Sequence, residues 1–191
     1  LVDLALTNYD GRQRLYLGRV GGGFDQATGR MPMLAFPAVA VAAGDLDGDS
    51  DLDLFFATNG QDRVYINNGQ GFFTDHTQSA LPPRTEMSVQ AFVVDLDGDG
   101  DKDLLACEAS NASGNNLQAY RNNGSGIFAS MSLGVNTAPT ARLLPADFDN
   151  DGDIDIFRLD SQASGAYPWA AELLRNLGGG TFQAVPLGAI A

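Results

Sequence analysis

The sequence has very few residues of several kinds, and each shortage excludes a class of protein. Lysine occurs once, as Lys102, and only three of the 24 acidic residues in this chain of 191 are glutamate. Because Lys and Glu are strong helix formers, their scarcity argues against a helical bundle. Cys107 is the only cysteine, which excludes an intrachain disulfide and a zinc-thiolate site. The only histidine, His76, lies in a polar stretch, so a zinc hydrolase is not expected.

Long apolar runs are also absent. The longest extends over 11 residues from Met33 to Ala43 and contains Pro37, whereas crossing a bilayer takes roughly 20 residues. The sequence has no initiator methionine and no charged-then-apolar leader, as expected of a processed or excised segment. We therefore expect no insertion into a membrane.

Negative charge and glycine are what the chain has in excess. The net charge is −13, so the protein should repel phosphate backbones and anionic lipid headgroups, and nucleic acid is not an expected partner. Cations are the favoured partners instead. The 23 glycines and the predominance of Asp among the acids predict strands joined by many turns.

One nine-residue pattern occurs three times and organises the sequence. Its copies are DLDGDSDLD at 45–53, DLDGDGDKD at 95–103 and DFDNDGDID at 147–155. Each copy lies between two short apolar runs, as a tight loop between two buried strands would. Each is followed by an Asn/Gly turn typical of a hairpin, in YINNGQGFF from Tyr65, YRNNGSGIF from Tyr120 and LRNLGGGTF from Leu174. Each repeat therefore predicts four short strands.

A four-stranded unit of this size cannot bury both faces of its sheet, so the units must pack side by side, most economically in a ring. This predicts an all-β fold, a single β-propeller domain of about four antiparallel four-stranded blades. The start of the chain aligns with the second repeat, with Asp3 opposite Asp53, so we expect one blade to be split across the termini. The predicted blades are 1–37 with 186–191, 38–86, 87–137 and 138–185. The alternative is that the chain is a fragment of a larger ring of blades.

Fifteen aspartates lie in the three loops, and they carry the whole negative excess of the chain. Clustered carboxylates repel one another unless a cation lies among them, and hard oxygen ligands in a flexible geometry select Ca²⁺. In each loop the side chains at positions 1, 3, 5 and 9 can converge, while position 7 offers its backbone carbonyl. We therefore expect about three structural Ca²⁺ ions. The expected ligand residues are Asp45, Asp47, Asp49, Asp51, Asp53, Asp95, Asp97, Asp99, Asp101, Asp103, Asp147, Asp149, Asp151, Asp153 and Asp155.

Two other interpretations of these loops are weaker. An EF-hand needs a bidentate Glu at position 12, where this chain has Phe56, Ala106 and Arg158, and helices on either side of the loop. An Asp/Gly turn without metal would leave five carboxylates in each loop without compensation of their repulsion.

The pattern D-x-D-G-D-G-x-x-D between apolar strands, followed by N-N-G-x-G-x-F, resembles the FG-GAP/VCBS repeat of integrin-α-like β-propellers over essentially the whole chain. The resemblance implies a calcium-stabilised extracellular propeller used for adhesion, ligand binding or scaffolding. Three departures stand out. The first repeat lacks its acidic loop, Asn150 replaces the usual Gly in the third loop, and Gly18-Arg19 replaces the Asn-Asn pair. A fourth calcium site at the termini is therefore not part of the prediction.

Two further sets of residues are candidates for binding or modification. Tyr167 and Trp169, in a long connection of the last repeat, offer a stacking platform for a sugar ring, or alternatively pack against the blade edge. Asn111 and Asn123 begin N-x-[ST] sequons and are candidates for N-glycosylation.

These observations favour a non-enzymatic module outside the cell, acting in adhesion or as a structural unit of a surface assembly. Its expected partners are cell-surface proteins or glycans, or other copies of the chain that exchange terminal strands to build a fibril. A lectin-like module that binds a carbohydrate or a protein ligand is the alternative. A glycan hydrolase ranks last, because the spare carboxylates Asp10, Asp62, Asp75 and Asp160 show no pairing in the sequence.

Overall fold

The computed structural model describes residues 1–109, 117–135, 140–160 and 169–190. The described residues form strands and one four-residue helix, α1 (Thr77–Ala80). No helix among them is long and apolar enough to span a bilayer. The strands are β1 (Leu4–Leu6), β2 (Arg14–Gly18), β3 (Phe24–Gln26), β4 (Ala38–Gly44), β5 (Asp53–Thr58), β6 (Arg63–Asn67), β7 (Phe73–Asp75), β8 (Ser88–Val94), β9 (Asp103–Glu108), β10 (Leu117–Asn122), β11 (Phe128–Met131), β12 (Thr140–Ala146), β13 (Asp155–Asp160), β14 (Trp169–Asn176) and β15 (Phe182–Ile190).

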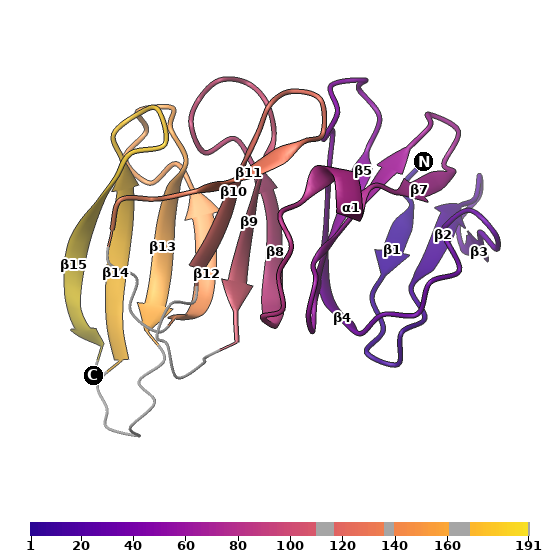
Figure 1. The fold of residues 1–191 in the computed structure, drawn as a ribbon, viewed down its shortest axis with the longest axis horizontal. Coiled ribbons are helices and arrows are strands. Elements are labelled where there is room, and N and C mark those ends of the chain that lie inside the picture. The colour runs from indigo at the N-terminus through magenta and orange to yellow at the C-terminus, as the bar shows by residue number, and fades with distance from the viewer. Residues whose placement is uncertain (110–116, 136–139, 161–168, 191) are drawn as a thin grey trace.

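The strands form four antiparallel sheets, each a meander of strands consecutive in the sequence. We call these sheets the first to fourth blades: β1–β3, β4–β7, β8–β11 and β12–β15. Figure 1 shows them side by side in chain order, with the N- and C-terminal blades at opposite ends of the row. The predicted all-β fold of propeller blades is confirmed.

The hydrophobic core lies between neighbouring blades. One cluster joins the second and third blades and includes Phe55 and Tyr120. Another joins the third and fourth blades and includes Ile156 and Leu174. Strands β5 and β9 are buried at every residue, because a blade has a neighbour on each face of its sheet. Each blade is thus stabilised mainly by the blades beside it, as the repeat pattern predicts.

The prediction of a blade split across the termini is wrong. Strand β15 continues to Ile190 and pairs with β14, with Trp169 opposite Ile190 and a register shift near Glu172. Residues 186–190 therefore belong to the fourth blade, and the first blade has three strands. A hairpin between consecutive strands closes a far shorter loop than a pairing across the whole chain, so it costs less conformational entropy.

The first blade nevertheless follows the predicted alignment. The backbone N–H of Gly18 donates to Asp3 Oδ1 over 2.8 Å. In the second blade, the backbone N–H of Asn67 donates to Asp53 Oδ1 over 2.7 Å. Asp3 is therefore the counterpart of Asp53, as the sequence predicted.

Candidate functional site

The three nine-residue repeats form loops at the same edge of the second, third and fourth blades. We call residues 45–53, 95–103 and 147–155 the first, second and third acidic loops. Each connects the first two strands of its blade, β4–β5, β8–β9 and β12–β13. Residues at positions 4 and 6 adopt a positive φ, which is 82° at Gly48 and 60° at Asn150. Asn tolerates this left-handed conformation better than most side chains, which explains why Asn150 can replace glycine.

The aspartate at position 1 accepts hydrogen bonds from backbone N–H groups of its own loop. Asp45 Oδ1 accepts the N–H of Gly48 over 2.8 Å, and its Oδ2 accepts the N–H of Ser50 over 2.9 Å. Asp95 makes the equivalent bonds to Gly98 and Gly100. These bonds hold the position 1 carboxylate toward the interior of the loop, where the other carboxylates converge.

The aspartate at position 9 is fully buried and fixes the loop to its blade. Asp103 accepts the N–H of Leu96 over 2.9 Å and the N–H of Asn122 over 2.8 Å. Asp53 and Asp155 make the same pair of contacts in their own blades. Burial raises the pKa of Asp53 and of Asp103 to about 6. Loop closure and strand pairing thus depend on the same carboxylate.

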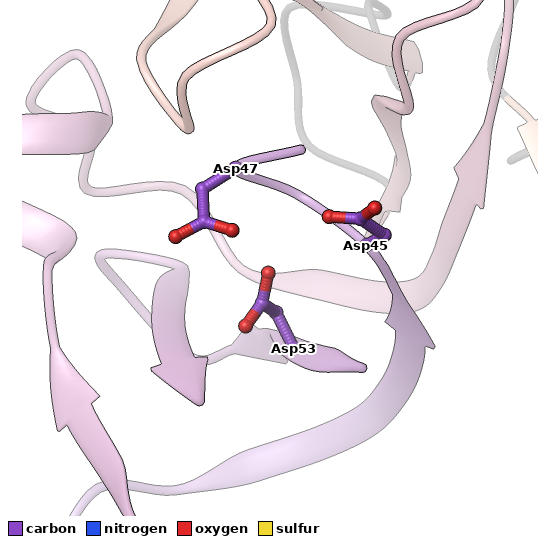
Figure 2. A group of neighbouring side chains, drawn as sticks. All are labelled: Asp45, Asp47 and Asp53. Carbon is purple, nitrogen blue, oxygen red and sulfur yellow. The ribbon is translucent and has the colours of Figure 1, made fainter. Parts of the chain in front are cut away.

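In each loop three carboxylates meet. The groups are Asp45, Asp47 and Asp53; Asp95, Asp97 and Asp99; and Asp147, Asp149 and Asp155. Within each group, one oxygen from each carboxylate lies within 4.8 Å of the others. Figure 2 shows the first group, with the three side chains turned toward one another. The structure thus brings together most of the predicted side-chain ligands of every loop.

The side chains at position 7 are directed elsewhere. Asp51 lies against Gly69 in the outer hairpin, so closely that a Cβ on Gly69 would come within 2.4 Å of Asp51 Oδ2. Asp101 has the same relation to Gly124, at 2.6 Å. The position 7 carboxylates therefore lie outside the carboxylate clusters, and a ligand role for the backbone carbonyl of position 7 stays a prediction.

The donor set suits a hard divalent cation. All the converging atoms are carboxylate oxygens, which Ca²⁺ prefers. In the third loop, Asp147 Oδ1 is buried without a hydrogen-bond partner, although its counterparts in the other loops accept an N–H from position 4. A buried carboxylate oxygen that lacks a donor is costly, and a bound cation would satisfy it. Each acidic loop can therefore accommodate a metal ion.

An inter-blade contact that sequence reasoning missed joins the first and second acidic loops to the blade that follows each of them. We call Asn67, Asn122 and Asn176, at the ends of β6, β10 and β14, the clasp asparagines. Asn122 Nδ2 donates to Leu46 O, in the loop of the preceding blade, over 2.8 Å, and to Lys102 O in its own blade over 2.9 Å. Asn176 donates to Leu96 O over 2.8 Å and to Ile154 O over 3.1 Å.

The side chain at position 2 of the first and second acidic loops is buried at the same contact between blades. Leu46 is fully buried in the cluster between the second and third blades, and Leu96 is fully buried in the cluster between the third and fourth. Phe148 has no following blade within the described chain and is 43% exposed. The asparagine that recurs at the start of each outer hairpin was the one sequence feature that could have indicated this contact between blades. From the sequence alone it was interpreted as a turn residue.

The chain offers no obvious catalytic group in its described part. His76 is exposed, and its Nε2 lies 3.0 Å from Thr74 Oγ1. Cys107 is completely buried, and burial raises the pKa of its thiol to about 11. The expectation that Cys107 acts as a small buried residue is confirmed.

Asp62 is a buried carboxylate outside the acidic loops. It is 1% exposed, and burial raises its pKa to about 6. Its two oxygens accept the N–H of Thr58 over 2.9 Å and the hydroxyl of Ser88 over 2.8 Å. Because both oxygens are occupied by buried donors, Asp62 joins the second and third blades and is poorly placed to act as a general base.

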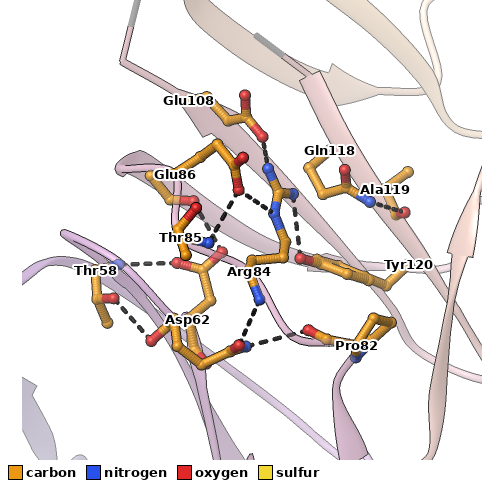
Figure 3. Close-up of polar contacts among 12 residues, drawn as sticks. Thr58, Asp62, Pro82, Arg84, Thr85, Glu86, Glu108, Gln118, Ala119 and Tyr120 are labelled. Carbon is orange, nitrogen blue, oxygen red and sulfur yellow. Dashed lines mark hydrogen bonds and ion pairs between the residues drawn. The ribbon is translucent and has the colours of Figure 1, made fainter. Parts of the chain in front are cut away.

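Arg84 lies beside Asp62 and ties the segment between the second and third blades to the third blade (Figure 3). Its guanidinium forms an ion pair with Glu108, which is buried. It also donates to the Tyr120 hydroxyl over 3.2 Å and lies 3.4 Å from Glu86 Oε2. Because the Arg84 guanidinium contacts Glu86, Glu108 and Tyr120, all in the segment before the third blade or in that blade, we assign it a structural role.

The other predicted site residues are only partly within the described chain. Asn111 and Tyr167 lie outside the described residues, and Trp169 is described only through its place in β14. Asn123 is exposed in the hairpin between β10 and β11, and its Oδ1 accepts the N–H groups of Ser125 and Ile127. Glycosylation at Asn111 and Asn123 stays a prediction.

The fold and the loops define the class of protein: a β-propeller assembled from repeated blades, three of which carry an acidic loop. The family model described as an FG-GAP-like repeat matches residues 1–56, 45–106 and 95–158. The chain belongs to this family, and the resemblance seen in the sequence is confirmed. Comparison with curated proteins gave no match.

Among solved structures, a lectin of Agrocybe aegerita is similar to this chain, with 22% sequence identity and a TM-score of 0.57. Its structure concerns specific recognition of non-reducing terminal N-acetylglucosamine. The alignment covers 96% of this chain and 48% of the lectin, so the chain spans about half the lectin's length. At this identity the similarity concerns the fold alone.

Proposed function

We propose that the chain is a non-enzymatic, extracellular β-propeller module in which each acidic loop binds one structural Ca²⁺. The observation that carries this proposal is the threefold repetition of one arrangement: a carboxylate cluster whose loop is fixed to its own blade by position 9. A catalytic centre would need to occur once, whereas a structural ion is needed wherever this loop recurs.

The proposed ligands in each loop are the carboxylates at positions 1, 3, 5 and 9 and the carbonyl at position 7. Calcium supplies positive charge that offsets the repulsion among these carboxylates. The chain's own contribution is to hold the oxygens in place. Position 1 does so through the loop backbone, and position 9 through the N–H groups of position 2 and of the clasp asparagine. Calcium binding is thereby coupled to the folding of the blade.

The proposed location outside the cell follows from the character of these loops. They are partly exposed and built from short-range turns, and extracellular calcium-binding modules have sites that fill at roughly 10⁻⁴ to 10⁻³ M. Such concentrations occur outside cells. In this setting we propose that the module acts in adhesion or as a structural unit of a surface assembly, with a surface protein, a glycan or another copy of the chain as partner.

Calcium removal is expected to destabilise the module strongly. Three sites that bind only the folded state should together raise the unfolding midpoint by at least about 10 °C at saturation. Thermal unfolding followed by circular dichroism, in millimolar calcium and then in excess EGTA, measures this difference. Magnesium at equal concentration is the control, because it demands stricter octahedral geometry and should stabilise the protein less. Identical midpoints in calcium and EGTA would refute the proposal.

Carbohydrate binding is a second candidate function, favoured by one observation, the similarity of the fold to a lectin. The residues we would assign to it are Tyr167 and Trp169, which offer aromatic surfaces for a sugar ring. A glycan array that includes chains ending in N-acetylglucosamine tests it. Binding that is lost in Trp169→Ala, with an unchanged unfolding midpoint, would support a lectin. Absence of binding to any glycan would leave adhesion through protein surfaces.

A further inference from the structure

The residue that precedes the clasp asparagine differs among the three blades with acidic loops. It is Arg121 in the third blade, Arg175 in the fourth and Ile66 in the second. Arg121 Nε lies 2.5 Å from Asp97 Oδ2, and its guanidinium also reaches Asp99 Oδ2 at 3.4 Å. The same geometry recurs in the fourth blade.

In that blade, Arg175 Nε lies 2.5 Å from Asp149 Oδ2 and its guanidinium lies 3.8 Å from Asp151 Oδ2. In both blades the arginine therefore contacts the carboxylates at positions 3 and 5. In the second blade, Ile66 is 9% exposed and packs in the apolar cluster between blades. Within the described residues, the ion pairs made by the acidic loops involve Arg121 and Arg175 only, and none reaches the first loop.

We infer that Arg121 and Arg175 act as built-in competitors for calcium, so that the first acidic loop is the strong site and the second and third are weaker. This inference rests on the proposed function. A guanidinium stays protonated at any physiological pH, so a cation entering either loop must displace it from two ligand carboxylates. The strand keeps the displaced charge near the loop, and its repulsion of a divalent ion should weaken binding by about tenfold.

The same contacts make the loops unequal when calcium is absent. In the second and third loops the arginine offsets part of the repulsion among the carboxylates, so these loops should stay closed. The first loop has no such cation and should open alone. Its position 2 residue, Leu46, forms part of the junction between the second and third blades. Sensitivity to calcium is therefore concentrated at one junction of the module.

The test removes the competing charges and leaves the ligands in place. The variants are Arg121→Gln, Arg175→Gln and the double variant, and Arg121→Lys keeps the charge. The matched control is Arg19→Gln, which removes an exposed arginine paired with Asp25 in the first blade. Arg121 and Arg175 are 57% and 45% exposed, so neither glutamine should prevent folding.

Calcium titration calorimetry at low ionic strength should give one tight site and two weaker sites for the wild-type chain. In the double variant, the two weaker dissociation constants should fall by about tenfold, whereas Arg19→Gln and Arg121→Lys should leave them nearly unchanged. Hydrogen exchange gives a second readout. EGTA should increase exchange in 45–53 of the wild type, and in all three loops of the double variant.

Two results would overturn the inference, and they have different consequences. Three equal sites that are insensitive to the double substitution would overturn it and leave the calcium proposal intact. Absence of calcium binding in both the wild-type chain and the double variant would overturn the proposed function, and the inference with it.

Discussion

Asp103→Ala is expected to lower the free energy of unfolding by about 3 to 5 kcal/mol, because it leaves two buried N–H groups, those of Leu96 and Asn122, without an acceptor. The side chain is fully buried, so both N–H groups lie away from bulk solvent. The loss should be present in EGTA and should grow in calcium, since a proposed ligand is also removed. Urea-induced unfolding under both conditions separates the two contributions.

Asp101→Ala is the matched control in the same loop. Asp101 occupies position 7, outside the carboxylate cluster, and Ala keeps the backbone carbonyl proposed as the ligand. We expect a loss below about 1 kcal/mol, as for most partly exposed positions. Equal losses in Asp101→Ala and Asp103→Ala would contradict the structural role assigned to position 9.

Asn122→Ala should cost about 2 kcal/mol, because it removes the side-chain link between the third blade and the acidic loop of the second. Asn122 is 4% exposed, and its Nδ2 satisfies the carbonyls of Leu46 and Lys102, one in each blade. Both carbonyls would lose their donor. Guanidinium-induced unfolding of the variant in calcium measures the effect.

Asn67→Ala provides the comparison within the same protein. Asn67 is the clasp asparagine of the second blade, but its Nδ2 donates only to Leu52 O, within its own blade, over 3.2 Å and at the surface. We expect a loss of about 0.5 to 1 kcal/mol, the net value of an ordinary hydrogen bond. If both variants lost the same free energy, the contact between blades would contribute nothing of its own.

Much of this architecture could be predicted from the sequence because its determinants are local. Gly, Asp and Asn at fixed spacing produce the acidic loop, and an Asn-Gly turn between apolar runs produces the hairpin. The conformation of Asn150 shows how local these rules are, since it takes the positive φ that Gly48 adopts in the first loop. Repetition then extended one local prediction to three blades.

The features that the sequence did not predict depend on contacts between residues far apart in the chain. Residues 186–190 align in sequence with the run before Asp45, but they pair with β14, which is much nearer in the chain and costs less conformational entropy to reach. The bond from Asn122 to Leu46 joins residues 76 apart in the sequence, and no turn rule predicts it. No sequence pattern distinguishes Arg121 and Arg175 from the other arginines, because only the fold brings them against the loop carboxylates.

The most direct test of calcium binding by the three loops is the number of calcium ions bound per chain, determined by equilibrium dialysis at roughly 20 mM free calcium, well above the proposed range of dissociation constants. One ion in each acidic loop gives an expected value close to three, which should fall by one when Asp45 and Asp47 of the first loop are both replaced by Asn. The double Asn variant keeps the size of both side chains and removes only their charge. No bound calcium at this concentration would contradict the account, and so would a value that stays unchanged in the double Asn variant.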